Sequence, residues 1–94
     1  MDLEEEVRGC VEASADVLPS EGLRAVRHFL EHGEYEMAFE GLVLELIQND
    51  ATPAGFYASK WLNVAEGLGL RAESVFVGDF WAQLTAWAAS REGN

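Results

Sequence analysis

Residues 29–47 read FLEHGEYEMAFEGLVLELI, and this stretch shows how the chain is built. On both sides of Gly33, apolar side chains recur every three to four residues, which is the spacing of helices that bury one face. Gly33 itself fits the left-handed position that often follows a helix end, because glycine has no Cβ to clash there. The pattern predicts a helix that ends near Gly33 and a more apolar helix from about Glu34 to Gln48.

Helical spacing continues toward the N-terminus. Apolar residues from Leu3 to Leu18 predict a first helix, with acidic residues between them, that ends near Pro19. Ser20 is a candidate N-cap for the second helix, because its hydroxyl can accept a hydrogen bond from a free backbone N–H.

Toward the C-terminus, a threonine–proline pair at Thr52 and Pro53 predicts the start of a fourth helix, with proline in its first turn. Gly67 and Gly69 would end that helix. Its apolar residues would be Phe56, Tyr57, Trp61, Val64 and Ala65.

Beyond Gly69, residues 75–77 could form a short extended piece, and a last helical face begins at Asp79 and carries Phe80, Leu84 and Trp87. No run of alternating apolar and polar residues is bounded by hairpin signals. We therefore expect an all-α fold: one helical domain over residues 1–94, built as a compact bundle of four to five short helices.

The charge of the chain restricts its partners. Its formal net charge is -11, and thirteen of its seventeen acidic residues lie in residues 1–50, with three of its six basic residues. Nucleic acids and anionic membranes are disfavoured as direct ligands, because binding them requires lysine and arginine. The charge favours a cationic protein partner, although acidic residues that only maintain solubility would give the same composition.

Cysteine content and the N-terminus indicate a reduced compartment. Cys10 is the single cysteine, so one chain can form neither an internal disulfide nor a cysteine-based metal cluster, and its helical position predicts an inert buried thiol. The N-terminal MDLEEE lacks the basic and apolar regions of a signal peptide. The longest uncharged run, residues 80–90, is shorter than the roughly 20 residues that span a bilayer. We expect a cytoplasmic protein.

No pattern of catalytic residues is evident. His28 and His32 share one helix face, but no third metal ligand accompanies them, and histidines in a last turn also suit the helix dipole. Nucleophile-elbow, zinc-protease, Walker and EF-hand motifs are missing from the sequence. We therefore expect no enzyme activity, no catalytic residue, no metal and no cofactor.

Two residues in helical segments require an explanation of their own. Trp81 lies about 100° around its helix from Phe80, so we expect it to be partly exposed and a candidate interface anchor, whereas Trp61 and Trp87 should pack in the core. Gly41 lies inside the third helix, where it costs about 1 kcal/mol relative to alanine. A close helix crossing would explain that glycine.

One block of the sequence resembles the MafI-type immunity proteins of bacterial polymorphic toxin systems. The matching residues are Gly33, Glu34, Tyr35, Ala38, Phe39, Glu40 and Leu42, and the resemblance covers roughly residues 20–50. It implies a small helical protein that neutralises a cognate toxin domain.

Together, the charge and the resemblance predict an immunity protein that binds a cationic toxin domain, with a nuclease as the expected toxin, through an acidic helical surface. The expected partner-binding residues are Glu31, Glu34, Glu36, Glu40, Glu45 and Trp81. The alternative is a structural or adaptor helical domain, including a homodimer built on the apolar C-terminal half. The sequence leaves the oligomeric state open.

Overall fold

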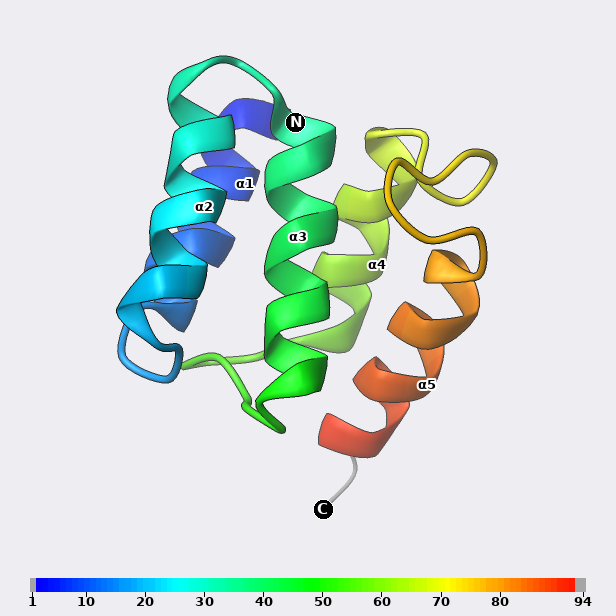
Figure 1. Cartoon of the computed structure of the whole chain (residues 1–94). Helices are drawn as coiled ribbons and strands as arrows, with labels where there is room; N and C mark the ends of the chain where they lie inside the picture. Colours follow the sequence, from blue (N-terminus) through cyan, green and yellow to red (C-terminus); the bar gives the residue numbers. More distant parts are fainter. Residues whose placement is uncertain (1, 93–94) are drawn as a thin grey trace.

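The computed structural model describes residues 2–92, and all regular secondary structure in that range is helical (Figure 1). The five helices are α1 (Leu3–Ser14), α2 (Ser20–Glu31), α3 (Tyr35–Gln48), α4 (Ala58–Gly67) and α5 (Phe80–Arg91). The prediction of an all-α bundle of short helices is confirmed.

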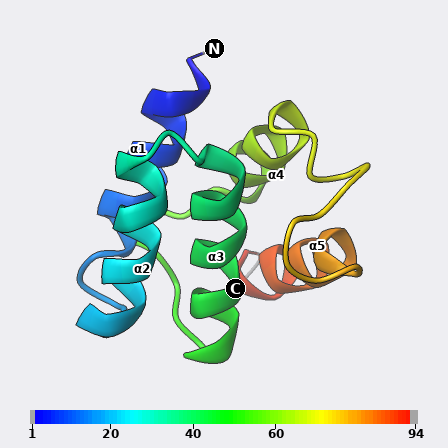
Figure 2. The same ribbon diagram turned by 45° about the horizontal axis from the view of Figure 1, so that its top comes forward.

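Helix α3 is the centre of the bundle. It contacts each of the other four helices, with α1 and α2 on one side and α4 and α5 on the other (Figures 1 and 2). A helix in that position must be apolar around most of its circumference. Its fully buried apolar residues are Ala38, Phe39, Leu42, Val43 and Leu46.

Helices α2 and α3 form an antiparallel hairpin and pack together more extensively than any other pair (Figure 1). Gly33 has a φ of 72° at the turn between them, so the left-handed glycine predicted from the sequence is confirmed. The predicted cap of α2 is wrong by one residue. Pro19 occupies the N-cap position, where no side chain makes a capping hydrogen bond, and Ser20 is the first residue of the helix.

The predicted start of the fourth helix is also wrong. Residues 52–57 are not helical, and Gly55 has a φ of 61°, which a continuing helix does not allow. Instead, α4 begins at Ala58, whose N–H donates a hydrogen bond of 2.9 Å to Glu92. This cap comes from 34 residues away in the sequence, so local pattern does not report it. Tyr57 therefore precedes the helix, with its side chain 66% exposed.

Aromatic side chains join α3, α4 and α5. Trp61 and Trp87 are buried, as predicted, with ring centroids 5.8 Å apart. The ring centroids of Phe39 on α3 and Trp61 are 5.6 Å apart, and those of Phe56 and Trp87 are 5.0 Å apart. Phe80 is fully buried as well, which confirms the apolar face predicted for α5. This aromatic cluster is one of the contacts that join the second half of the chain to the hairpin.

The last two points about the helices are the burial of Cys10 and whether any helix could cross a membrane. Cys10 is buried on α1, and burial raises the pKa of its thiol to about 12, as expected for an inert cysteine. Among the helices of residues 2–92, none has the length and apolar character needed to cross a membrane.

Candidate partner-binding surface

The segment between α4 and α5 is held by a side chain of α3. Residues 71–79, here called the clasped loop, contain no strand, so the extended piece considered for residues 75–77 does not form a sheet. Three consecutive backbone N–H groups of this loop instead donate hydrogen bonds to the carboxylate of Glu40. The loop is therefore fastened to the centre of the bundle.

Both oxygens of the Glu40 carboxylate accept hydrogen bonds from the loop. Val75 N–H donates to Oε1 at 2.9 Å, while Phe76 N–H and Val77 N–H donate to Oε2 at 2.8 and 3.0 Å. Consecutive N–H groups that converge in this way form a concave site for an anion, and hydrogen bonds to a charged acceptor are stronger than neutral ones. Glu40 is 0% exposed, and these bonds replace the water that it loses.

This placement corrects the prediction that Glu40 belongs to an exposed acidic surface. The sequence does contain a signal for its burial. On α3, Glu40 follows Met37 by three residues and precedes Leu44 by four, so it lies within an apolar stripe of the helix. A carboxylate in such a stripe needs a buried partner, and here the partner is a backbone 35 to 37 residues away.

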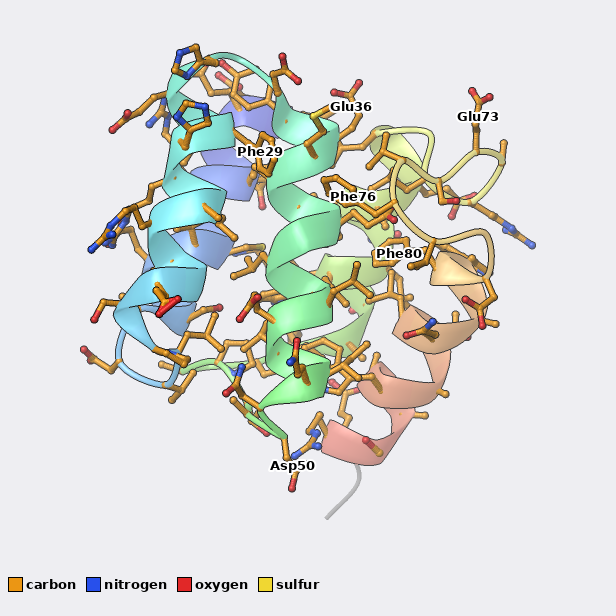
Figure 3. All side chains as sticks on the ribbon, viewed as in Figure 1. Phe29, Glu36, Asp50, Glu73, Phe76 and Phe80 are labelled. Atoms are coloured by element: carbon orange, nitrogen blue, oxygen red, sulfur yellow. The ribbon has the colours of Figure 1, made fainter. Side chains whose placement is uncertain are left out.

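An acidic hollow of about 570 Å³ lies beside the clasped loop, between it and the α2–α3 turn. Glu34 and Glu36 line it from the start of α3, and Glu73 lines it from the loop. All three side chains belong to exposed residues, and Figure 3 shows Glu36 and Glu73 projecting at the same end of the molecule. The fold thus brings together Glu34 and Glu36, which were predicted from the sequence, and Glu73, which was not.

Glu73 gave no signal in the sequence. It lies in a segment without helical periodicity, where its backbone N–H donates a hydrogen bond of 3.1 Å to the oxygen of Gly69. The complete lining of the hollow is His32, Gly33, Glu34, Glu36, Met37, Leu68, Gly69, Leu70, Glu73, Ser74 and Val75. No lysine or arginine is among these described residues, so the carboxylates of the hollow face no cation there.

The remaining predicted residues lie elsewhere. Glu31 is exposed at the end of α2, where it lines a different hollow together with Arg24 and Arg27. Glu45 is partly buried against α2, and Asn49 donates a hydrogen bond of 3.4 Å to its Oε1. The structure therefore does not gather the predicted acidic residues into one surface.

Trp81 is partly exposed, as predicted. The guanidinium of Arg71 lies 5.3 Å from the centroid of its ring, and Arg71 also pairs with Glu66 at 3.3 Å. A cation stacked on the indole face already covers part of that face. Trp81 is consequently a less accessible anchor than its position in the sequence suggested.

The two histidines on α2 make local contacts. Their ring centroids are 4.3 Å apart, and Nδ1 of His32 lies 2.9 Å from the backbone oxygen of His28. Within residues 2–92, no group of three or more histidine, cysteine, aspartate or glutamate side chains has an arrangement suited to a metal ion.

Comparisons of the chain with models of protein families, with curated proteins and with solved structures found no significant match. What this surface can bind therefore has to be inferred from its own geometry and charge.

Proposed function

We propose that this chain is an immunity protein that binds and neutralises a cationic toxin domain, with a nuclease as the toxin class that its charge fits best. The acidic hollow is the observation that carries the proposal. It presents Glu34, Glu36 and Glu73 at one end of the molecule, and the described residues of its lining include no lysine or arginine. Nucleases carry lysine and arginine to hold phosphates, and a fixed array of carboxylates competes for the same groups.

Rigidity of the surface supports the same function. Glu34 and Glu36 lie at the start of the central helix, and Glu73 lies in a loop that Glu40 fastens to that helix. Because the backbone that carries these carboxylates is held before binding, only the side-chain rotamers have to be ordered when the partner arrives. The resemblance of residues 20–50 to MafI-type immunity proteins points to the same class of partner.

The direct test is growth of cells that express the protein encoded beside this chain, with and without the chain itself. We expect the neighbouring protein to stop growth when it is expressed alone, and we expect this chain to restore it. A harmless neighbour, or one that kills regardless of the chain, would remove the proposal and leave the adaptor alternative.

Charge reversal tests the hollow itself. In the Glu34→Lys, Glu36→Lys double variant, association with the toxin should slow by about tenfold at low salt, because the attraction that steers encounter is lost. The difference should shrink as salt screens the charges. Stopped-flow mixing at several salt concentrations measures both effects.

A matched control separates local from overall charge. The Asp16→Lys, Glu21→Lys double variant makes the same change in net charge, but both residues lie near the opposite end of α2 and are exposed. It should slow association much less. Equal slowing in both double variants would mean that net charge alone guides the encounter and that the hollow is not the contact.

A further inference from the structure

The clasped loop exposes two large apolar side chains. Val75 is 44% exposed and Phe76 is 46% exposed, although the backbone N–H of each donates a hydrogen bond to the buried carboxylate of Glu40. The ring centroids of Phe76 and of Phe29 on α2 are 5.8 Å apart (Figure 3). The Phe76 ring also lies beside Gly41 of α3, where an added Cβ would be 3.8 Å from it. One face of Phe76 is therefore supported by the hairpin, while the rest of the ring remains in water.

A loop that served only to connect two helices would not need this arrangement. Polar residues at positions 75 and 76 would cost nothing in water, and a mobile connection would not need a buried glutamate to fix it. Here the carboxylate of Glu40 holds the backbone of the two apolar residues themselves, at 2.9 and 2.8 Å. Fixing an exposed aromatic side chain in one position is what an interface anchor requires, because its ordering cost is met before binding.

Charge around the pair indicates the chemistry of what covers it. Val75 lines the acidic hollow directly, next to Glu36 and Glu73. Figure 3 shows Glu36 and Glu73 at the same end of the molecule as Phe76. The nearby Arg71 is already paired with Glu66 and stacked on Trp81. The apolar pair thus has an acidic border on the side of the hollow, and a complementary surface would carry an apolar recess bordered by lysine or arginine.

We infer that Val75 and Phe76 form the apolar anchor of the interface, and that the partner is a basic protein domain with an apolar recess that receives the Phe76 ring. This inference rests on the proposed function, because it takes the cationic toxin domain as the occupant. It adds that binding depends on the clasped loop as well as on the carboxylates.

The test compares two exposed aromatic residues. Phe76→Ala removes the anchor, while Tyr57→Ala removes an aromatic side chain that is 66% exposed and precedes α4, at the other end of that helix from the loop. The probe is the protein encoded beside this chain, produced together with this chain so that the host survives, then separated from it in denaturant and refolded, and affinity is measured by calorimetry. Phe76→Ala should weaken binding by about thirtyfold, as for a central anchor, and Tyr57→Ala by less than about twofold.

A second variant guards against an effect on folding. Val75→Lys places a cation next to the hollow, so it should weaken binding through repulsion of a basic partner even where the loop keeps its conformation. Hydrogen exchange of the amides of residues 75, 76 and 77 should remain slow in Phe76→Ala, because their acceptor Glu40 is unchanged.

The outcomes separate the two proposals. If the unaltered chain does not bind the neighbouring protein, the proposed function fails and this inference fails with it. If the unaltered chain binds but Phe76→Ala and Val75→Lys bind equally well, the anchor is wrong while the proposed function stands. Loss of binding in both variants, with slow amide exchange and an unaffected Tyr57→Ala control, supports the anchor.

Discussion

The α2–α3 hairpin and the clasped loop are neighbours that are stabilised in opposite ways. In the hairpin, many buried apolar side chains share the stabilisation, and a single glycine at φ 72° makes the turn. In the loop, one side chain from α3 accepts three of the backbone hydrogen bonds, and the two central apolar residues stay exposed. Stability is distributed in the first region and concentrated in the second.

This difference separates what each region contributes to function. The hairpin determines where Glu34 and Glu36 lie, because both belong to the beginning of α3 or its turn. The loop determines where Glu73, Val75 and Phe76 lie. Glu40 holds the backbone of Val75 and Phe76, whereas the N–H of Glu73 donates to the backbone oxygen of Gly69. A substitution of a buried apolar residue of the hairpin should therefore lower the stability of the whole fold. A substitution of Glu40, which lies on α3 but holds the loop, should first change the conformation of the loop.

The largest effect is expected for Phe39→Ala. Phe39 is fully buried on α3 and lies 5.6 Å from Trp61, so its removal leaves a cavity between the hairpin and the aromatic cluster. We expect a loss of about 4 kcal/mol in the free energy of unfolding, measured with urea. Hydrogen exchange should accelerate in the hairpin and in the loop together. Acceleration confined to one of them would contradict distributed stabilisation.

An intermediate effect is expected for Glu40→Gln. An amide has one acceptor oxygen, so if that oxygen faces the N–H groups of Phe76 and Val77, its NH₂ group meets the N–H of Val75, donor against donor. We expect a loss of about 2 kcal/mol in the free energy of unfolding.

Hydrogen exchange of individual amides shows whether Glu40 supports the loop or the fold as a whole. The amides of residues 75, 76 and 77 should exchange much faster in Glu40→Gln, while those of the hairpin should change only through the lower overall stability. Glu36→Gln is the matched control, because Glu36 lies one turn earlier on α3 and is exposed. It should change stability by less than about 0.5 kcal/mol. Unchanged exchange at residues 75–77 in Glu40→Gln would show that the loop has other support.

The fold could be predicted from the sequence wherever stabilisation is local or periodic. The spacing of apolar residues placed α3 within one residue, and Gly33 placed its turn, because both signals lie in consecutive residues. The start of α4 was missed for the converse reason. Its first N–H is capped by Glu92 of the C-terminal segment, and Gly55 interrupts the chain in a way that a threonine–proline pair does not reveal.

The candidate site was predictable only in part, for the same physical reason. Glu34 and Glu36 follow from helix position and charge, so the sequence identified them. Glu40 was assigned to the exposed surface because of its charge. Its place in an apolar stripe of α3 indicated burial, but the backbone donors that compensate that burial lie 35 to 37 residues later in the chain. Phe76 depends on that contact, and Glu73 lies in a loop without helical periodicity. The hydrogen bonds between Glu40 and residues 75–77 join distant parts of the chain, so local sequence patterns do not predict the surface that they form.

The smallest effect is expected where the two regions meet. Gly41 lies on α3 beneath Phe76, and a Cβ built there would be 3.8 Å from the Phe76 ring and 4.0 Å from Val26. These are ordinary contact distances, so the close helix crossing suggested by the sequence does not require glycine. We expect Gly41→Ala to raise the free energy of unfolding by about 0.5 to 1 kcal/mol, because alanine favours the helix.

Gly9→Ala on α1 provides the reference for that gain. Gly9 is exposed in a helix, and a Cβ there would meet nothing within 4 Å, so its substitution should report helix propensity alone. If the loop rests on the hairpin without strain, the two substitutions should stabilise the protein equally in urea unfolding. A gain at Gly9 with a loss at Gly41 would mean that Phe76 needs the bare backbone beneath it. The hairpin would then shape the anchor directly, in addition to the hold that Glu40 has on the loop.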